Sequence, residues 1–131
     1  MRAALTRAGY RGTIGGDITF VDDLERGTYR LTETRVAGVK CDVPARLHDG
    51  RLVLIECKVS NSGTNSVKRL NRETGGKVAV WRQAFGTAAV TTSVVAGVYR
   101  LVNLRDAQQS GVTILWQHDL APLEEFARQA R

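Results

Sequence analysis

Two carboxylates and a lysine lie close together in one short part of the chain. Asp42 occurs in KCDVPARL, and Glu56 and Lys58 follow in LIECKVS. Carboxylate oxygens are ligands that magnesium prefers, and bound magnesium polarises a phosphoryl group and helps to generate hydroxide from water. Lys58 shares a strand face with Glu56, because side chains alternate along a strand, and its ammonium can there stabilise a charged transition state. The pattern predicts metal-dependent phosphodiester hydrolysis, with Asp42, Glu56 and Lys58 as catalytic residues.

A plainer interpretation places Glu56 and Lys58 on the solvent side of an ordinary strand, since Glu-x-Lys often occurs by chance. Residues 52–55 are all apolar, which is typical of a strand buried on both faces. Charged groups at the end of a buried strand are costly unless something pairs with them. The context therefore favours the catalytic interpretation.

The predicted site depends on the hairpin that joins these residues. Two strand-like runs, residues 39–47 and 51–59, flank Asp49-Gly50, and Asp-Gly between such runs is a strong hairpin signal. A two-residue turn would point Asp42 and Glu56 to opposite faces of the sheet. A three-residue turn, or a bulge in the first strand, would place them opposite each other on one face. A shared site thus predicts a bulge or a G1-type turn.

The residues after this hairpin change to a helical pattern. An apolar stripe repeats every three or four residues from Val67 to Phe85, which predicts an amphipathic helix on the sheet. Residues 65–82 hold five basic residues and one acidic residue, so the polar side suits a phosphate backbone. Lys77 lies off the centre of that side and is expected to contribute little to DNA binding. The predicted DNA-binding residues are Ser60, Asn61, Ser62, Asn65, Lys68, Arg69, Arg72 and Gly76.

The two glycines Gly75 and Gly76 interrupt this helical pattern. Each glycine in a helix interior costs about 1 kcal/mol relative to alanine. At Gly76 the missing side chain would allow a close approach to DNA. The alternatives are that the glycines break the helix into two, and that the basic side is only solvated.

The rest of the chain alternates helices and strands. Residues 1–16, rich in Arg and Gly, predict a flexible N-terminal stub, and residues 17–131 predict a single nuclease domain, the catalytic part of a longer chain. The order of elements predicts an α/β fold, with a mixed central sheet flanked by helices. The expected elements are a helix over 17–27, extended chain over 28–39, a strand over 92–102, a helix over 103–110, a strand over 112–116 and a helix over 119–130.

Composition narrows the function classes. The chain has 131 residues, of which 43% are hydrophobic and 24% charged, as in ordinary globular domains. The net charge of +6 favours nucleic acid as the partner. Cys41 and Cys57 lack the spacing of a zinc site or a disulfide framework, in line with a cytoplasmic location. The longest apolar runs are too short to span a membrane.

The run LIECKVSNSGTNSVKRLNRE, preceded by KCDVPARLHDGR, resembles the nuclease core of the PD-(D/E)XK superfamily. Within it, the chain is similar to type II restriction endonucleases of the XamI kind, from about Gly27 to WQHDL near residue 120. SNSGTNSVKRLN is the more specific part of the resemblance. Cys41 replaces the proline of the motif, a position that carries no chemistry. The resemblance implies a restriction-endonuclease-like core, and magnesium-dependent cleavage of double-stranded DNA by a homodimer.

The resemblance also implies roles for individual residues. Asp42 and Glu56 would bind the magnesium ion, with the backbone carbonyl of Cys57 as a further ligand, and Lys58 would be the catalytic lysine. A further glutamate often completes such a site; Glu25 and Glu33 compete for this role, and Glu33 is preferred.

Three alternatives to a restriction enzyme stay open. One is a repair or recombination nuclease of the same superfamily. Another is a nuclease-like module that binds DNA without cleaving it. The third is an α/β module whose basic helix binds an acidic protein.

Overall fold

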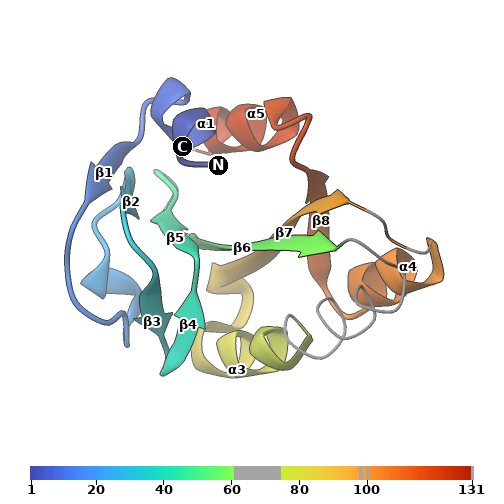
Figure 1. Ribbon diagram of the computed structural model, residues 1–131. Helices are drawn as coiled ribbons and strands as arrows, with labels where there is room; N and C mark the ends of the chain where they lie inside the picture. The colour runs from blue at the N-terminus through green and yellow to red at the C-terminus, as the bar shows by residue number, and fades with distance from the viewer. Residues whose placement is uncertain (61–74, 98, 100, 131) are drawn as a thin grey trace.

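The computed structural model describes residues 1–60, 75–97, 99 and 101–130, with Ser60 described by its backbone alone. Within these residues a six-stranded mixed sheet runs through the middle of the molecule, and a two-stranded sheet lies beside it (Figure 1). The large sheet has the order β1 (Arg11–Thr13), β2 (Thr28–Arg30), β5 (Val43–Arg46), β6 (Leu52–Ser60), β7 (Ala89–Gly97) and β8 (Val112–Trp116); the small sheet pairs β3 (Thr34–Val36) with β4 (Val39–Cys41).

Helices cover both faces of the large sheet (Figure 1). The first and last helices pack together on one face, and α3 lies on the other face. This arrangement confirms the expected α/β fold with a mixed central sheet. The helices are α1 (Arg2–Arg7), η1 (Val21–Asp23), α3 (Gly75–Phe85), η3 (Gly86–Ala88), α4 (Leu101–Gln109) and α5 (Ala121–Gln129).

Strand β6 separates two hydrophobic cores through the alternation of its side chains. Val53 and Ile55 lie in the core shared with α1 and α5. Leu52 and Leu54 lie in the core shared with α3. All four are fully buried. Continued alternation places Glu56, and the lysine two residues later, on the α3 face of the sheet.

The hairpin between β5 and β6 has the three-residue turn that a shared site requires. Val43 pairs with Ile55, and the N–H of Leu47 donates a 2.8 Å hydrogen bond to the carbonyl of Arg51. Gly50 has φ of 99°, and its N–H donates to the carbonyl of Leu47 at 3.0 Å. A three-residue turn that ends in a left-handed glycine is the G1-type arrangement. The predicted G1-type turn and register are confirmed.

The N-terminal residues are folded into the domain, which corrects the expected flexible stub over 1–16. Leu5 of α1 is fully buried, and β1 pairs in parallel with β2. The hydroxyl of Tyr10 donates a 2.9 Å hydrogen bond to the carbonyl of Ala127. The helix and strand of this segment have only six and three residues, which is too short for a period to show in the sequence.

Residues 17–27 do not form the expected helix. The described structure has one short turn there, η1, and Ile18 makes a β-bridge with Val36. The carboxylate of Asp23 accepts hydrogen bonds from the backbone N–H groups of Thr19 and Phe20, at 2.9 and 2.8 Å. Such local bonding offers the backbone an alternative to the helix.

The later elements agree more closely with the sequence. The expected strand over 92–102 is β7, which begins earlier and ends at Gly97, and the strand over 112–116 is β8. The helices expected over 103–110 and 119–130 are α4 and α5, with ends shifted by one or two residues. The helix expected from Val67 to Phe85 is described only from Gly75, and its earlier part lies outside the described residues.

No helix among the described segments combines the length and apolar character that crossing a membrane requires.

Candidate active site

The two predicted metal ligands lie together at the base of the β5–β6 hairpin. Asp42 occupies the bend between β4 and β5, and its Oδ2 accepts a 2.8 Å hydrogen bond from the backbone N–H of Cys57. The backbone N–H of Asp42 in turn donates to Oε2 of Glu56 at 3.4 Å. These contacts bring the two carboxylates to neighbouring positions, as the register requires.

Glu56 is an ionisable group inside the protein. Its side chain is 0% exposed, and burial raises its pKa from the ordinary value of 4.5 to about 7, because the charged form loses its hydration. The Lys77 ammonium, which is bonded to it, lowers this pKa, and the neighbouring Asp42 raises it. Additional positive charge at this position would favour the ionised carboxylate.

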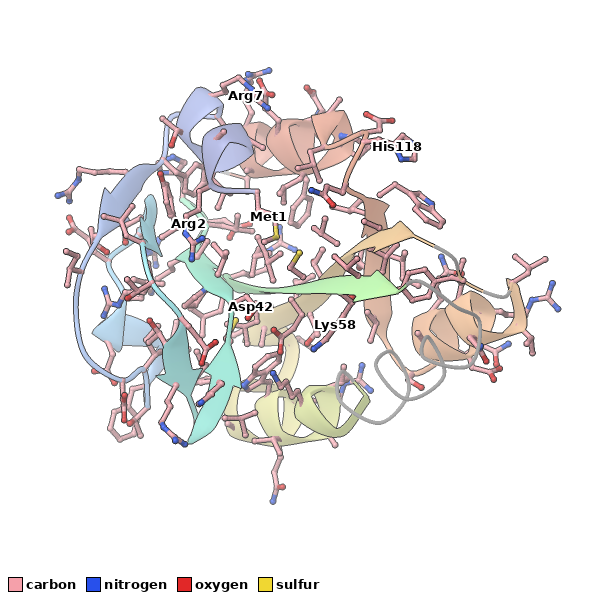
Figure 2. All side chains as sticks on the ribbon, viewed as in Figure 1. Met1, Arg2, Arg7, Asp42, Lys58 and His118 are labelled. Carbon is pink, nitrogen blue, oxygen red and sulfur yellow. The ribbon has the colours of Figure 1, made fainter. Side chains whose placement is uncertain are left out.

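Lys58 shares the sheet face of Glu56 and is 8% exposed. Figure 2 shows it on the side of β6 that faces α3. Its backbone carbonyl accepts a 3.0 Å hydrogen bond from the hydroxyl of Tyr99, and the ring of Tyr99 packs edge-on against Trp116. The structure therefore brings Asp42, Glu56 and Lys58 to one part of the sheet. Tyr99, which has no sequence motif around it, is a contact of this strand that the sequence did not reveal.

A second lysine, which no sequence motif marks, also lies at the site. Lys77 of α3 forms an ion pair with Oε1 of Glu56, and its ammonium donates a 2.7 Å hydrogen bond to the backbone carbonyl of Lys40. Lys77, expected to matter little for DNA binding, therefore lies at the carboxylate site instead. Lys77 flanks the apolar stripe one turn before Trp81, and a long side chain at that boundary reaches the sheet. A lysine one turn before a buried aromatic residue was the available signal.

The N-terminal helix supplies another unexpected contact. Nη2 of Arg2 donates a 3.0 Å hydrogen bond to the backbone carbonyl of Asp42, and Nε donates to that of Arg30 at 3.4 Å. Figure 2 labels Met1, Arg2 and Asp42 in the same part of the molecule. Arg2 thereby helps to fix the bend that carries the carboxylate. No local pattern marks this contact, because 40 positions separate the partners.

The two glutamates considered as additional ligands lie elsewhere. Glu25 forms an ion pair with Arg11 at 3.0 Å, and Glu33 forms one with Lys40 at 3.7 Å. Among the described residues, no group of three or more His, Cys, Asp or Glu side chains is placed to hold a metal ion. The described site thus contains two carboxylates, without the third that Glu33 was expected to supply.

Most predicted DNA-binding residues lie outside the described part of the chain. Ser60 ends β6, where it pairs with Gly97. Gly76 is exposed, and no atom lies within 4 Å of a Cβ built there. Gly76 lies on the side of α3 away from Trp81, so Lys77, not Gly76, is directed towards the site. The residues outside the described part of the chain are Asn61, Ser62, Asn65, Lys68, Arg69 and Arg72.

A family model described as XamI restriction endonuclease matches residues 1–116. The chain belongs to the XamI restriction endonuclease family. It is 56% identical over 61 residues to the type II restriction enzyme XamI of Xanthomonas campestris pv. amaranthicola. That similarity covers 47% of this chain and 22% of the relative, so the chain spans only a minor part of that enzyme's length.

A solved structure shows a similar fold. The crystal structure of protein VC1899 from Vibrio cholerae superposes with a TM-score of 0.50 and 19% identity, over 69% of this chain and 22% of that chain. At this identity the likeness concerns the fold alone. XamI family membership and the mixed sheet together support the expected restriction-endonuclease-like core.

The donor groups of this XamI-family site suit a hard divalent cation. Asp42 and Glu56 offer carboxylate oxygens, and Cys57 offers a backbone carbonyl, all of which are oxygen ligands of the kind that magnesium prefers. A cationic group, the ammonium of Lys77, already lies against the buried carboxylate of Glu56. The position therefore attracts positive charge, and the residues present fit a magnesium ion.

Proposed function

We propose that this chain is the catalytic part of a type II restriction endonuclease, which hydrolyses phosphodiester bonds in double-stranded DNA with magnesium. The observation that carries the proposal is the convergence of Asp42, Glu56 and Lys58 on one hairpin of a XamI family member. Two carboxylates beside an ammonium group supply the charges that metal-assisted phosphodiester hydrolysis needs.

Each residue has a defined part in this proposal. Asp42, Glu56 and the carbonyl of Cys57 hold the cation, which when bound supplies charge neutralisation at the phosphoryl group and acidifies water. Lys58, on the same face, orients the attacking water and stabilises the negative charge that develops on the phosphoryl oxygens. The hydrogen bonds from Cys57 to Asp42 and from Tyr99 to Lys58 hold these groups in place.

Duplex binding and assembly form part of the same proposal. The net charge of +6 and the basic residues around 65–82 favour contacts with phosphate, which position a protein on DNA without reading its sequence. A two-fold homodimer presents two equivalent sites, one for each strand of the duplex.

The decisive experiment measures cleavage of supercoiled plasmid DNA with and without magnesium. The parent chain is expected to nick or linearise the plasmid only when magnesium is present. Glu56→Ala and Lys58→Ala are each expected to lower the rate by about 100-fold or more, because each removes charge stabilisation at the reacting phosphate. Circular dichroism checks that both variants stay folded.

Glu125→Ala is the matched control, since it removes an exposed carboxylate from α5 on the other face of the sheet. It is expected to cleave at the parental rate. Cleavage by Glu56→Ala at that same rate would refute the assignment. Duplex binding by the parent without any cleavage would favour the nuclease-like binding module instead.

A further inference from the structure

Lys77 makes contacts that hold its ammonium at the carboxylate site. It is ion-paired with Glu56 and hydrogen-bonded to the carbonyl of Lys40 at 2.7 Å. The side chain of Lys77 is 20% exposed, whereas that of Glu56 is 0% exposed. The lysine thus places one end of α3 against both the catalytic strand and β4, with part of its side chain still open to solvent.

A buried carboxylate needs a positive partner, since an unpaired ion loses its hydration without compensation. Asp42 lies next to Glu56, so the site concentrates negative charge in a small space. In the metal-free protein, the ammonium of Lys77 supplies one positive charge to this pair. It also accounts for the buried state of Glu56, which the hairpin alone would leave uncompensated.

A divalent cation at the same carboxylates would meet Lys77 at close range. Like charges within a few ångströms of each other repel strongly where little water separates them. The stem of a lysine has four flexible carbons, and the solvent-exposed part of Lys77 leaves it a route out of the site. The Lys77 ammonium is therefore the group expected to move away from Glu56 when the divalent cation binds.

We propose that Lys77 is an internal counter-ion, which occupies the cation position at Glu56 until a divalent cation displaces it. The inference rests on the proposed function, because it takes Asp42 and Glu56 as the metal ligands. Lys77 acts in it as a positioning residue: it keeps the carboxylates paired and buried before the metal binds. Binding of the cation then releases this end of α3 from the catalytic strand.

The first test is calorimetric titration of magnesium chloride into the DNA-free chain. Removing the competing charge in Lys77→Met is expected to tighten magnesium binding by about tenfold, within the range typical of coupling between two ligands of one site. Lys77→Gln, which keeps a donor for Glu56 without the charge, is expected to tighten it as well. Lys77→Arg keeps the charge and should bind magnesium as the parent does.

Lys40→Met is the matched control for the change in net charge. Lys40 is exposed and pairs with Glu33, and its contact with Lys77 uses only the backbone carbonyl. Its effect on magnesium affinity is expected to stay within about twofold, because exposed charges are screened by water and salt. If Lys77 had only a structural role, its removal would loosen the site, and magnesium affinity in Lys77→Met would stay unchanged or fall.

The second test follows the ammonium itself. The modification rate of Lys77 by an amine-reactive reagent, measured by mass spectrometry, is expected to rise when magnesium is added, whereas that of Lys40 stays constant. Parental affinity in the folded Met and Gln variants, or an unchanged modification rate at saturating magnesium, would overturn the inference while the proposed function stands. Absence of magnesium binding in the parent and in both of these variants would overturn both.

Discussion

Glu56 combines two properties that rarely occur together in one residue: complete burial and an expected role as an ion. The β5–β6 hairpin fixes the Glu56 side chain on the α3 face of the sheet, and Lys77 provides the compensating charge. Burial nevertheless outweighs this compensation, since the pKa is raised to about 7. The metal-free protein therefore carries a stability cost at this residue near neutral pH.

This cost predicts a pH-dependent gain in stability for Glu56→Gln. Folded Glu56 keeps its proton up to about pH 7, whereas an unfolded glutamate loses it near 4.5, so the folded state binds more protons between these values. The contribution of Glu56 to the stability of the folded state therefore falls as the pH rises from 4.5 to about 7. The free energy of unfolding of the variant relative to the parent should rise by a few kcal/mol from pH 4.5 to pH 8, since one pKa unit corresponds to about 1.4 kcal/mol.

Urea unfolding in the presence of a chelator measures this difference at several pH values. Contributions from ionisable groups distant from Glu56 are common to both proteins and cancel in the difference. A Glu125→Gln variant, which changes an exposed carboxylate on α5, is expected to show no such trend. A flat difference for Glu56→Gln between pH 4.5 and 8 would contradict the raised pKa.

The residues of the site fall into two groups: some are marked by a local sequence pattern, and others come from distant parts of the chain. Asp42, Glu56 and Lys58 were predictable because strand alternation and a single turn relate them. Arg2 and Lys77 reach the same site from elements 40 and 21 positions away from their partners. The sequence around Lys77 specifies only a helix and that around Arg2 does not show even this, and tertiary packing decides which strand each segment meets.

At the scale of elements, α1 differs most from what the sequence suggested. Leu5 lies in the same core as Val43 and Ile55, the residues that follow Asp42 and precede Glu56. The N-terminal helix thus supports the β5–β6 hairpin from the face of the sheet opposite Glu56 (Figure 1). A flexible stub would contribute nothing to this core.

Leu5→Ala tests this contribution. Truncating a fully buried leucine is expected to lower the free energy of unfolding by about 2–5 kcal/mol, because it removes buried apolar surface and leaves a cavity. Chemical denaturation of the parent and the variant measures the loss. Unchanged stability would mean that α1 does not pack in solution as described.

Arg7→Ala is the control within the same helix. Its side chain is 58% exposed and pairs with Glu124, so its removal should cost only about 0–1 kcal/mol, as exposed ion pairs generally do. A comparable loss in both variants would indicate general sensitivity of the helix instead of a specific core contact.

Elements were predictable in proportion to the length of their periodic pattern. The hairpin, β7, β8 and α5 have sustained patterns or clear turn signals, and each lies close to its expected place. The expected helix over 17–27 failed because side-chain bonding by Asp23 and a bridge from Ile18 replaced helical bonding. Such short segments are decided by contacts with distant strands, which the sequence does not display.

At the scale of the whole molecule, the two faces of the sheet carry different groups: apolar and terminal contacts lie on one face, and the proposed site lies on the other. The α1–α5 face joins the two ends of the chain through the Tyr10–Ala127 and Arg7–Glu124 contacts. The opposite face carries Glu56, Lys58 and Lys77. Duplex DNA approaching this site would therefore meet the α3 side of the protein.

The basic stretch after β6 predicts that duplex affinity depends on particular arginine side chains, and not on the net charge alone. Arg69→Ala and Arg72→Ala are each expected to weaken binding to all duplexes alike, and to lower the slope of log affinity against log salt by about 0.9, the share of one phosphate contact. Arg7→Ala removes the same charge from α1, on the face of the sheet away from Glu56 (Figure 2), and should leave the slope unchanged. Fluorescence anisotropy at several salt concentrations, without magnesium, measures these slopes. An equal flattening by all three variants would show that net charge, and not the basic stretch after β6, attracts the DNA.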